Sequence, residues 1–430
     1  MADVRAFRGF RYDLGKIGAL ANVVAPPYDV VDAALQQTLY DLSEYNAIRL
    51  ELTKDDPTTR VDKYTQAART LNGWLNDDAV RQDTARTFYV YEQEFAVEGT
   101  THTRRGFFAR VRLEPFGTGR VFPHEQTLPG PKADRLKLYQ ATGFNISPVF
   151  GLYPDPDHEV MAILDAQVKN SPPLTAKDHL GVTNRLWLVT DDTAISRIIG
   201  LMGPKPIYIA DGHHRYETGV KYLDEQRALG NVHDDETAVN FCLMVLVGMT
   251  DPGLVIQPTH RLLSGLPDLT SPQLQALLAP HFEVVAEFGP DAVGCWDHVQ
   301  LEDSQDVLGF VTAADGLCFA ARLSDASVMD ELAPERSAEW RGLAVSLLHK
   351  VVLDKLLAPH GPPTCAYVHL LKEVTDAVAA KACQVACLVP AVGMEHVEAV
   401  AANRETMPPK STYFYPKVLT GIVFHSLKKE

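Results

Sequence analysis

The sequence is poor in positive charge and has no tract rich in lysine or arginine. Its 430 residues include 55 acidic and 40 basic side chains, which gives a formal net charge of −15. A field of this sign repels nucleic acids and anionic membrane surfaces, so we expect neither as a partner. Any phosphate site must therefore be built from a few local cations and backbone N–H groups.

Cysteine pairs and long apolar segments are also missing. The six cysteines include no CxxC pair, and Cys383 and Cys387, four residues apart, have no histidine pair that would complete a zinc pattern. The longest apolar stretch, 239–249, is far shorter than the ~20 residues of a membrane-spanning helix. The first 13 residues lack the apolar segment of a secretory signal. These absences predict buried, reduced thiols in a soluble cytoplasmic protein.

Apolar residues make up 46% of the chain and charged residues 22%, the balance of a globular protein. At this length, two or three folded units are expected. A connection rich in proline, serine and aspartate, Leu266–Gln273, predicts a boundary between region 1–265 and region 266–430. The familiar nucleotide-binding signatures are absent: there is no GxxxxGKS or GxxxxGKT loop, no GxGxxG turn and no HRD/DFG pair.

Periodicity predicts strands that alternate with helices, which indicates an α/β or mixed α+β fold. The expected strands cover 48–52, 87–91, 106–111, 186–189, 206–210, 310–311, 317–320, 366–370 and 384–389. The expected helices cover 61–75, 216–229, 338–357, 374–381 and 394–402, with a short one after an N-cap at Asp191 or Asp192. Polar turns around Glu98-Gly99 and 314–316 indicate two hairpins.

The segment Asp211-Gly212-His213-His214-Arg215 is the strongest local signal, because it lies between an apolar strand and a helix. The N-terminus of a helix offers unpaired backbone N–H groups and a partial positive charge, and a glycine lets the backbone approach an anion closely. The two histidines and the arginine add donors, so the segment predicts a phosphate-binding turn. Two alternatives stay open, a tight turn with surface histidines and a zinc site, although neither HExxH nor Cys/His spacing surrounds the segment.

Two polar loops are further candidates. The first loop follows Phe122-Pro123-His124 and holds Glu125, Lys132 and Arg135. The second loop, 407–417, holds Lys410, Ser411 and Thr412 among prolines and aromatic residues. Rigid loops of this kind often line ligand sites, and lysines neutralise phosphate. The alternatives are charges that pair with one another in the first loop and aromatic packing in the second.

Asp29 follows Pro26-Pro27-Tyr28, where the prolines fix the backbone. An immobile carboxylate suits a general base or a Mg²⁺ ligand. The alternative is a carboxylate that caps a turn or a helix.

Six ordered blocks together resemble one large, uncharacterised prokaryotic family. They read APPYDVV, FPHEQT with GPKADRL, NISPVFGLY, PIYIADGHHRYET, PTHRLLSGL and MPPKSTYFYPKVLTG, and they extend from Pro26 to Gly421. The DGHHR block is also similar to the phosphate-binding motif of the ParB/sulfiredoxin superfamily, which includes kinases that phosphorylate free L-serine with ADP or ATP. The resemblance implies a ParB-like nucleotide-binding core in region 1–265, without the DNA-binding half of ParB proteins.

The resemblance further implies a phosphotransferase that uses ATP or ADP, with Mg²⁺, to convert free L-serine to O-phosphoserine. Phosphoryl transfer depends mainly on positioning and charge neutralisation. The residues that we assign to the phosphates are Gly212, His213, His214 and Arg215, assisted by Lys132, Arg135, Lys410, Ser411 and Thr412, so that region 266–430 contributes its loop to the site. The candidates for the catalytic base are Asp29, Glu125 and Asp211. Glu125 and Asp211 are the candidates for Mg²⁺, with Glu125 favoured for the metal and Asp29 for the base.

Two other functions stay open at this point. One is a nucleotide-binding regulator or NTP hydrolase that has no small-molecule acceptor. The other is a metal-dependent hydrolase that uses the histidine pair. Release of ADP that depends on serine distinguishes a kinase from the first, and bound stoichiometric zinc would support the second.

Overall fold

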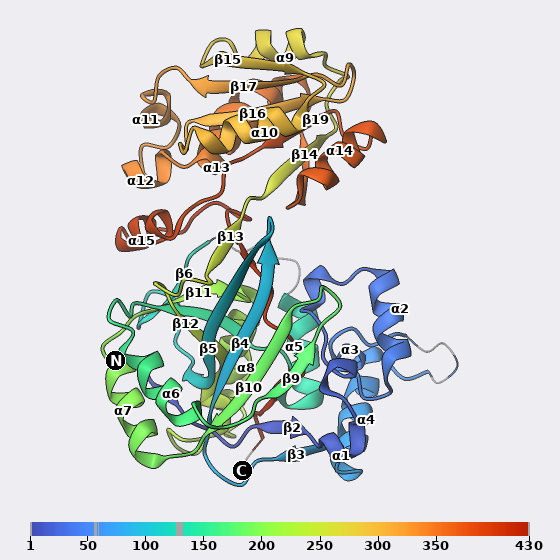
Figure 1. Cartoon of the computed structure of the whole chain (residues 1–430), viewed down its shortest axis with the longest axis vertical. Coiled ribbons are helices and arrows are strands. Elements are labelled where there is room, and N and C mark those ends of the chain that lie inside the picture. Colours follow the sequence, from blue (N-terminus) through green and yellow to red (C-terminus); the bar gives the residue numbers. More distant parts are fainter. Residues whose placement is uncertain (1, 56–57, 59, 126–131, 429–430) are drawn as a thin grey trace. The chain divides into compact units, whose positions relative to one another are not determined.

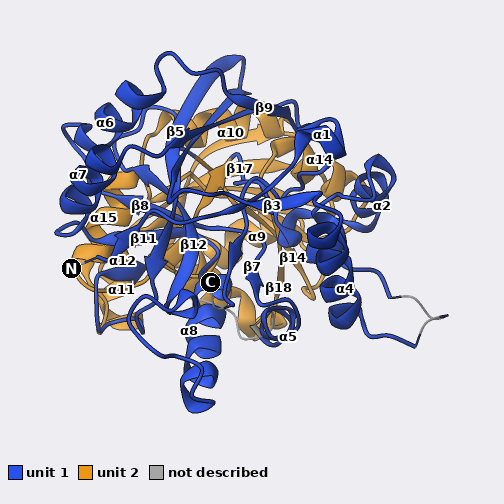
Figure 2. Ribbon diagram, turned by 90° about the horizontal axis from the view of Figure 1, so that it is seen from below, with its two compact units in different colours: residues 1–123, 127–255, 416–430 blue, residues 124–126, 256–415 orange. Residues whose placement is uncertain are grey.

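Most of the apolar segments form strands of two large β-sheets, one in each of two units (Figures 1 and 2). The computed structural model describes residues 2–55, 58, 60–125 and 132–428, without the side chain of residue 132. Unit 1 comprises Met1–Pro123, Thr127–Val255 and Pro416–Glu430, and unit 2 comprises His124–Gln126 and Ile256–Tyr415. The mixed α+β fold predicted from the sequence is confirmed.

The division of the chain differs from the expected boundary at 265/266. The chain passes from unit 1 to unit 2 after Val255 and returns to unit 1 at Pro416. The polar connection Leu266–Gln273 instead joins a strand to a helix inside unit 2, where Leu266 and Leu269 are buried in the core. A proline- and serine-rich composition is typical of any strand–helix connection, so it did not mark a linker here.

Unit 1 is built on a nine-stranded sheet with the order β6-β11-β8-β12-β5-β4-β10-β9, to which β1 adds beside β5. The pairs β11–β6 and β12–β8 are parallel, and the other pairs are antiparallel. The strands are β1 (Val4–Arg5), β4 (Phe88–Val97), β5 (Thr100–Arg112), β6 (Val121–Pro123), β8 (Val149–Tyr153), β9 (Leu174–Lys177), β10 (Thr183–Val189), β11 (Ile207–Asp211) and β12 (Phe241–Gly248).

Helices and short strands complete unit 1. The helices are α1 (Leu14–Ile17), α2 (Ala33–Leu42), α3 (Ile48–Glu51), α4 (Lys63–Asn76), α5 (Lys132–Thr142), α6 (Glu159–Val168), α7 (Asp192–Met202) and α8 (His213–Ala228). Two small ribbons pair β2 (Phe10–Tyr12) with β3 (Val80–Gln82), and β7 (Phe144–Asn145) with β21 (His425–Ser426). Helix α5 packs between α4 and α8.

Local sequence signals account for several of these elements. Glu98 and Gly99 both have positive φ angles, 49° and 80°, as a two-residue hairpin turn requires, and the predicted hairpin of β4 and β5 is confirmed. The carboxylate of Asp62 accepts from two backbone amides at the start of α4, and Asp191 caps α7 in the same way. The predicted helix over 61–75 and the predicted N-cap are therefore confirmed.

The predicted strand over 48–52 is wrong, because these residues form the short helix α3. The side chain of the buried Asn46 accepts a hydrogen bond from the amide of Ile48 at 3.0 Å and starts the helical turn. Both Ile48 and Leu50 are buried even so, which is why their spacing resembled a strand. The turn places Glu51 in the interior of unit 1, where it is 2% exposed.

Unit 2 contains a six-stranded antiparallel sheet with the order β15-β17-β16-β19-β14-β18. Its strands are β14 (His260–Ser264), β15 (Phe282–Gly289), β16 (Val307–Thr312), β17 (Cys318–Leu323), β18 (Thr364–Val368) and β19 (Val385–Leu388), and the chain also forms β13 (Val255–Gln257) and β20 (Tyr413–Tyr415). Its helices are α9 (Ser271–Leu278), α10 (Ala292–Leu301), α11 (Val328–Leu332), α12 (Ala338–Arg341), α13 (Ala344–Leu347), a π-helix (Leu348–Leu357), α14 (Leu371–Ala379) and α15 (Met394–Ala402). The predicted second hairpin and the alternation of strands and helices after residue 364 are confirmed.

The single helix predicted over 338–357 is interrupted. Gly342 ends α12, and Leu343 has an extended backbone with ψ of 134° before α13 begins. The chain then continues as the π-helix, in which Leu348, Val351 and Val352 are buried. Apolar residues are buried on one side of the whole segment 338–357, so their spacing has a helical period throughout. This spacing does not reveal the interruption at Leu343.

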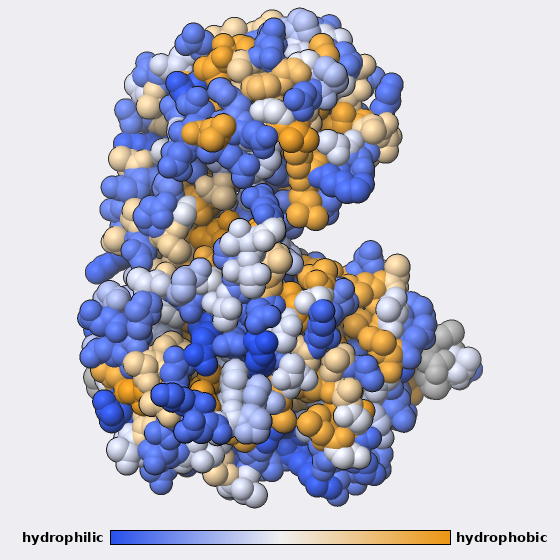
Figure 3. All heavy atoms as spheres, in the orientation of Figure 1, coloured by the Kyte–Doolittle hydropathy of each residue, from blue (hydrophilic) through white to orange (hydrophobic). Residues whose placement is uncertain are grey.

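Polar and apolar residues are mixed on the surface. Figure 3 shows hydrophilic residues over most of the face that it presents, with apolar side chains between them. The most exposed large apolar side chains, Leu301 and Leu229, are 84% and 70% exposed and lie at the ends of α10 and α8. Within the described ranges, no helix combines the length and the apolar character that a membrane crossing requires.

Candidate functional site

The segment 211–215 forms the predicted strand–turn–helix. Strand β11 ends at Asp211, Gly212 adopts a left-handed backbone with φ of 86°, and α8 begins at His213, three residues earlier than expected. The first amides of a helix have no partner within that helix, and Gly212 has no side chain to cap them. A Cβ atom at Gly212 would lie 2.8 Å from Nε of Arg215, so a larger residue would also displace that guanidinium.

Asp211 is held between two cations. Its Oδ1 accepts a hydrogen bond from Nζ of Lys417 at 2.8 Å, and its Oδ2 accepts one from the guanidinium of Arg215. The Arg215 side chain is 5% exposed and also donates to the carbonyl of Pro148. Burial alone would raise the pKa of Asp211, but Lys417 and Arg215, with His213 nearby, hold it well below its usual range. The carboxylate is therefore ionised and paired.

Arg104 is a further buried cation within electrostatic range of the Asp211 carboxylate. It donates to the side chain of Gln93 and to the carbonyl of Pro416, and burial lowers its pKa to about 10. Asp211 opposes that shift, so the two groups lie within electrostatic range. Three cations, Lys417, Arg215 and Arg104, thus lie within electrostatic range of Asp211. Asp251 also acts on Arg104, and Asp29 and Glu51 act on Arg215.

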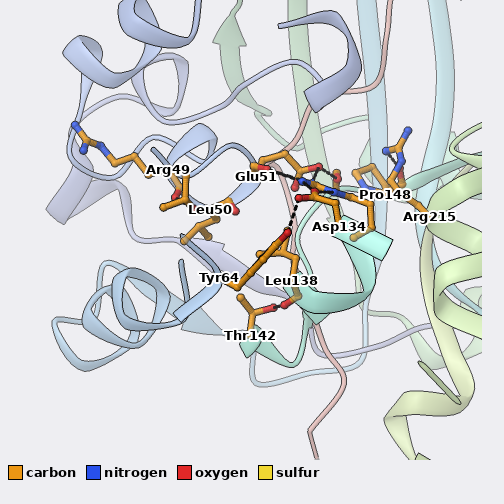
Figure 4. A network of polar contacts seen from close by, with 12 residues as sticks. Arg49, Leu50, Glu51, Tyr64, Asp134, Leu138, Thr142, Pro148 and Arg215 are labelled. Carbon is orange, nitrogen blue, oxygen red and sulfur yellow. Dashed lines mark hydrogen bonds and ion pairs between the residues drawn. The ribbon is translucent and has the colours of Figure 1, made fainter. Parts of the chain in front are cut away.

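A second polar network, which includes Glu51 and Asp134, lies beside Pro148 and Arg215 (Figure 4). Its central group is the guanidinium of Arg135 on α5. The guanidinium of Arg135 donates to the backbone carbonyl of Glu51 from both terminal nitrogens at 3.1 Å, lies 3.2 Å from its carboxylate, and pairs with Asp134. Glu51 also accepts from the hydroxyl of Ser147 at 2.7 Å, one residue before the carbonyl that Arg215 binds. The two networks therefore meet at Ser147-Pro148.

Asp134 belongs to this network and is not a separate polar group of a loop. It accepts from Nζ of Lys63 at 2.8 Å and from the hydroxyl of Tyr64 at 2.7 Å. Burial alone would raise the pKa of Asp134, but the hydrogen bonds from Lys63, Tyr64 and Arg135 lower it strongly. The charges of this segment are thus paired with one another and with α4, which is the alternative that the sequence left open for them.

The Pro-Pro-Tyr-Asp segment contributes to the same region. The guanidinium of Arg135 lies 4.3 Å from the centre of the Tyr28 ring, and burial raises the pKa of Tyr28 to about 12. Asp29 is exposed and raises the pKa of Arg215, so its carboxylate lies within electrostatic range of the DGHHR segment. Asp29 is inside a short 3₁₀ helix, Tyr28–Val30, whose N-cap is Pro27, so it is not the cap of that helix.

Unit 1 thus gathers most of the residues predicted for the site. Asp29, Arg135, Asp211, Gly212, His213 and Arg215 come from three segments of the sequence and interact in the two networks. His214 lies in the first turn of α8 and is half-buried. Lys132 starts α5, but its side chain and residues 126–131 lie outside the described part of the chain.

Sequence reasoning missed several members of the networks, among them Tyr28, Glu51, Arg104 and Lys417. Lys417 and Tyr28 stand inside family-like blocks, and that position was the available signal. No sequence signal marked Glu51, which was assigned to a strand. None marked Arg104 either, which falls in the predicted hairpin.

The remaining predicted residues lie together in unit 2. Residue 125 forms a backbone bridge with Met407, and the ring of His124 is hydrogen-bonded to the hydroxyl of Thr412. Lys410 has a left-handed backbone with φ of 60°, and its carbonyl accepts from Arg261 at 2.9 Å. The hydroxyl of Ser411 is buried and donates to the carbonyl of Pro408 at 2.6 Å. The two polar loops therefore meet each other. The phosphate contacts of Lys410, Ser411 and Thr412 stay predictions, and so does the role of Glu125 as catalytic base or Mg²⁺ ligand.

The geometry of Asp211 does not suit a Mg²⁺ ligand. Each of its oxygens already accepts a hydrogen bond from a cation, so a metal ion there would be repelled by Lys417 and Arg215 or would have to displace one of them. Among the residues that the structure describes, no group of three or more His, Cys, Asp or Glu side chains is arranged to hold a metal ion. The exposed carboxylate of Asp29 is the better candidate in unit 1.

Residues 4–345 match the family model described as a protein of unknown function, DUF1015. The chain belongs to the DUF1015 family. The resemblance of its six blocks to a large uncharacterised family is confirmed by this match. No curated protein matches the chain.

Several solved structures show a low similarity to the chain. A conserved hypothetical protein from Pyrococcus furiosus is 12% identical, with 73% of this chain and 92% of that chain covered and a TM-score of 0.34. A free serine kinase in complex with AMP is 13% identical, with 72% and 86% covered and a TM-score of 0.34. SbnI with a C-terminal truncation, from Staphylococcus aureus, is 10% identical, with 73% and 85% covered and a TM-score of 0.34.

Proposed function

We propose that this protein binds the phosphates of ATP or ADP at the N-terminus of α8 and transfers a phosphoryl group to a small hydroxyl compound. Free L-serine is the proposed acceptor and O-phosphoserine the product. The observation that carries the proposal is the group of cations around one ionised carboxylate, Asp211, beside the left-handed glycine that begins α8. The identity of the acceptor rests on the similarity of the DGHHR block to the free-serine kinases.

Charge neutralisation is the first requirement of phosphoryl transfer, and unit 1 meets it without a basic surface. Lys417, Arg215 and Arg104 are fixed by hydrogen bonds, so they lose little conformational freedom when an anion approaches. The N-terminus of α8 adds its partial positive charge. Asp211 orients Lys417 and Arg215, and in this proposal it is a positioning residue.

The acceptor hydroxyl requires a base, and we assign that role to Asp29. Its carboxylate is exposed and lies in electrostatic range of Arg215, whereas Glu51 and Asp211 are committed to ion pairs. A general base must be able to accept a proton, which an unpaired carboxylate does more readily. Mg²⁺ binds to proteins mainly through substrate phosphates, waters and one or two carboxylates, so we expect it to enter with the nucleotide.

The nucleotide site is tested by replacing Lys417 with methionine. Lys417→Met removes one cation but leaves Asp211 its partner Arg215, so the fold should survive. Loss of one charge-assisted contact of about 1.5 kcal/mol corresponds to roughly 10-fold weaker binding of Mg-ATP or Mg-ADP in isothermal titration calorimetry. Lys221→Met, on the exposed side of α8, is the matched control and should bind as the wild type does. Equal affinity in both variants would place the phosphates elsewhere.

The reaction is tested by following ATP and L-serine together. We expect O-phosphoserine, detected by ³¹P NMR, in proportion to the ADP released. Asp29→Asn should lower kcat while the KM for ATP stays nearly unchanged. ADP release at the same rate without serine would instead support an NTP hydrolase.

A further inference from the structure

Unit 1 contains a groove between helix α6 and strand β10, which pack against each other (Figure 1). Its volume is about 500 Å³, which is within the range of pockets that hold small molecules. Residues of the helix, of the loop after it and of two strands line the groove, among them Arg105, Asp165, Ala166, Lys169, Ser171 and Trp187. These residues are separate from the two networks around Asp211 and Arg135.

The groove lies on the opposite face of the sheet from the cations beside α8. Successive side chains of a strand point to opposite faces, and Arg104 and Arg105 are neighbours on β5, which pairs with β4 in regular register. Arg104 donates to the carbonyl of Pro416, whereas Arg105 contacts Asp165 of α6. A ligand in this groove therefore occupies a place separate from the phosphates that we assign to α8.

Two planar side chains that line the groove are held in place. The guanidinium of Arg105 lies 3.0 Å from the carboxylate of Glu92 and 2.7 Å from Oδ1 of Asp165. It also lies 5.7 Å from the centre of the Trp187 ring, and the indole N–H donates to the carbonyl of Ser171 at 2.9 Å. Trp187 packs against the core and is half-buried, so its ring is fixed but partly exposed. Aromatic rings and guanidinium planes are the surfaces on which proteins stack nucleobases.

Asp165 offers one acceptor that a ligand can reach. Its Oδ1 faces Arg105 and is closed to solvent, but the side chain as a whole is 41% exposed. Its Oδ2 accepts no hydrogen bond from any residue that the structure describes, and it is not closed to solvent. Because Asp165 lines the groove, Oδ2 is the oxygen that is open to a ligand there.

Lys169 offers a donor at the end of the same helix. It follows Asp165 by four residues, so the two side chains lie on one side of α6. No ion pair joins them, and within the described ranges the ammonium group of the exposed Lys169 has no partner. The exposed hydroxyl of Ser171 is a second donor that lines the groove. The groove therefore combines an open acceptor, open donors and an aromatic surface.

This combination restricts the ligand. A simple anion would be repelled by Asp165, and a simple cation by Arg105 and Lys169. A nucleobase is neutral and planar, and adenine and cytosine each carry an exocyclic amine next to a ring nitrogen that accepts hydrogen bonds. The amine matches the carboxylate, and the ring nitrogen matches the ammonium or hydroxyl group. We propose that the groove binds an amino-bearing nucleobase, adenine or cytosine, stacked against Trp187 with its amine donating to Oδ2 of Asp165.

Calorimetric titration of the full chain with adenosine, cytidine, uridine and ribose tests the class of ligand. None of the four carries a phosphate, so the inference does not rest on the proposed function. Uridine presents a carbonyl oxygen where the other two bases present the amine, so it should bind roughly 10-fold more weakly than adenosine or cytidine. Ribose should not bind. Absence of binding for adenosine and cytidine, or equal affinity for uridine or ribose, overturns the proposal.

Asp165→Asn should reverse the preference for the base. Arg105 requires an acceptor, so the amide oxygen should face Arg105 and the NH₂ group should face the groove. The variant should bind adenosine roughly 10-fold more weakly than the wild type and bind uridine more tightly. Glu159→Gln is the matched control, because Glu159 is an exposed carboxylate at the start of α6 and does not line the groove, so it should change neither affinity. An unchanged order of affinities in Asp165→Asn overturns the assignment.

Trp187→Leu removes the stacking surface and should weaken adenosine binding roughly 10-fold or more. Its affinity for inorganic pyrophosphate, which has no base, should equal that of the wild type, and circular dichroism shows whether the variant is folded. Lys417→Met should give the converse result, weaker binding of pyrophosphate and unchanged binding of adenosine. Failure of this inference and failure of the proposed function therefore give different results. Unchanged adenosine affinity in folded Trp187→Leu overturns the site, and Asp165→Asn decides the question if Trp187→Leu does not fold.

Discussion

Asp211→Asn tests whether the cations beside α8 depend on one carboxylate. The substitution keeps the size of the side chain but removes the carboxylate that accepts from Lys417 and Arg215, whose side chains are 11% and 5% exposed. An asparagine offers one acceptor oxygen and turns an N–H group toward one of the two cations. Breaking a buried ion pair by removing one partner costs about 3–5 kcal/mol, so we expect the free energy of unfolding of unit 1 to fall by about that amount. The affinity for inorganic phosphate should rise, because one negative charge is removed from beside the cations.

The stability difference between wild type and Asp211→Asn should depend on pH in one direction. The pKa of Asp211 in the folded protein is below the 3.8 of an ordinary aspartate, so its contribution is fully present above the unfolded value. It is lost as the pH falls through the folded value. The difference should therefore be constant above about pH 5 and become smaller below about pH 4.

Urea unfolding at pH 7, 5 and 3 measures this difference, with hydrogen exchange of α8 peptides to report unit 1 separately. Asp224→Asn is the matched control, because it removes a carboxylate from the same helix that is 65% exposed and 3.7 Å from Arg227. A surface pair of this kind contributes about 0–1 kcal/mol, so the control should change little. A loss for Asp211→Asn no larger than that of the control, or a loss that does not shrink in acid, would refute the reasoning.

Three further outcomes are expected. Gly212→Ala should destabilise unit 1 by about 1–3 kcal/mol and weaken phosphate binding, because φ is 86° and the added Cβ would displace the guanidinium of Arg215. Gly200→Ala, in a helix with open space, should be neutral or stabilising in the same urea titration. Glu51→Gln should lower the free energy of unfolding by about 1.5–3 kcal/mol, because Arg135 loses a charged partner but keeps Asp134, and wild-type stability would contradict this. All six cysteines are free and the pKa of each is raised by burial, so an Ellman titration at pH 8 should modify at most the half-buried Cys365 before unfolding.

The sequence predicted best where local chemistry decides the structure. The turn at Gly212, the hairpin at Glu98-Gly99 and the cap at Asp191 each depend on neighbouring residues, and each was predicted correctly. The strand predicted over 48–52 failed because Asn46 supplies a side-chain acceptor that starts a helix, and apolar spacing alone does not show it. The division of the chain was missed because it depends on contacts of 416–430 that are made far from that segment in sequence.

The candidate site was also predicted best where a local sequence pattern marks its residues. The predicted segments around Asp29, Arg135 and Asp211 interact in unit 1, since the family-like blocks marked them. Their partners were less visible: Glu51 is 84 residues from Arg135, and Lys417 is 206 residues from Asp211. Pairing across such distances is fixed by the packing of whole elements, which no local pattern records.

The order of the chain has a consequence for synthesis. Asp211 precedes the long segment of unit 2, Ile256–Tyr415, in the sequence. Lys417, which pairs with Asp211, follows that segment, as does the strand β21 that pairs with β7. A ribosome that has made the first 255 residues has therefore produced most of unit 1 without Lys417, and Arg104 is still without the carbonyl of Pro416. The cation cluster is completed only after all of unit 2 has been translated, so a nascent chain cannot assemble it early.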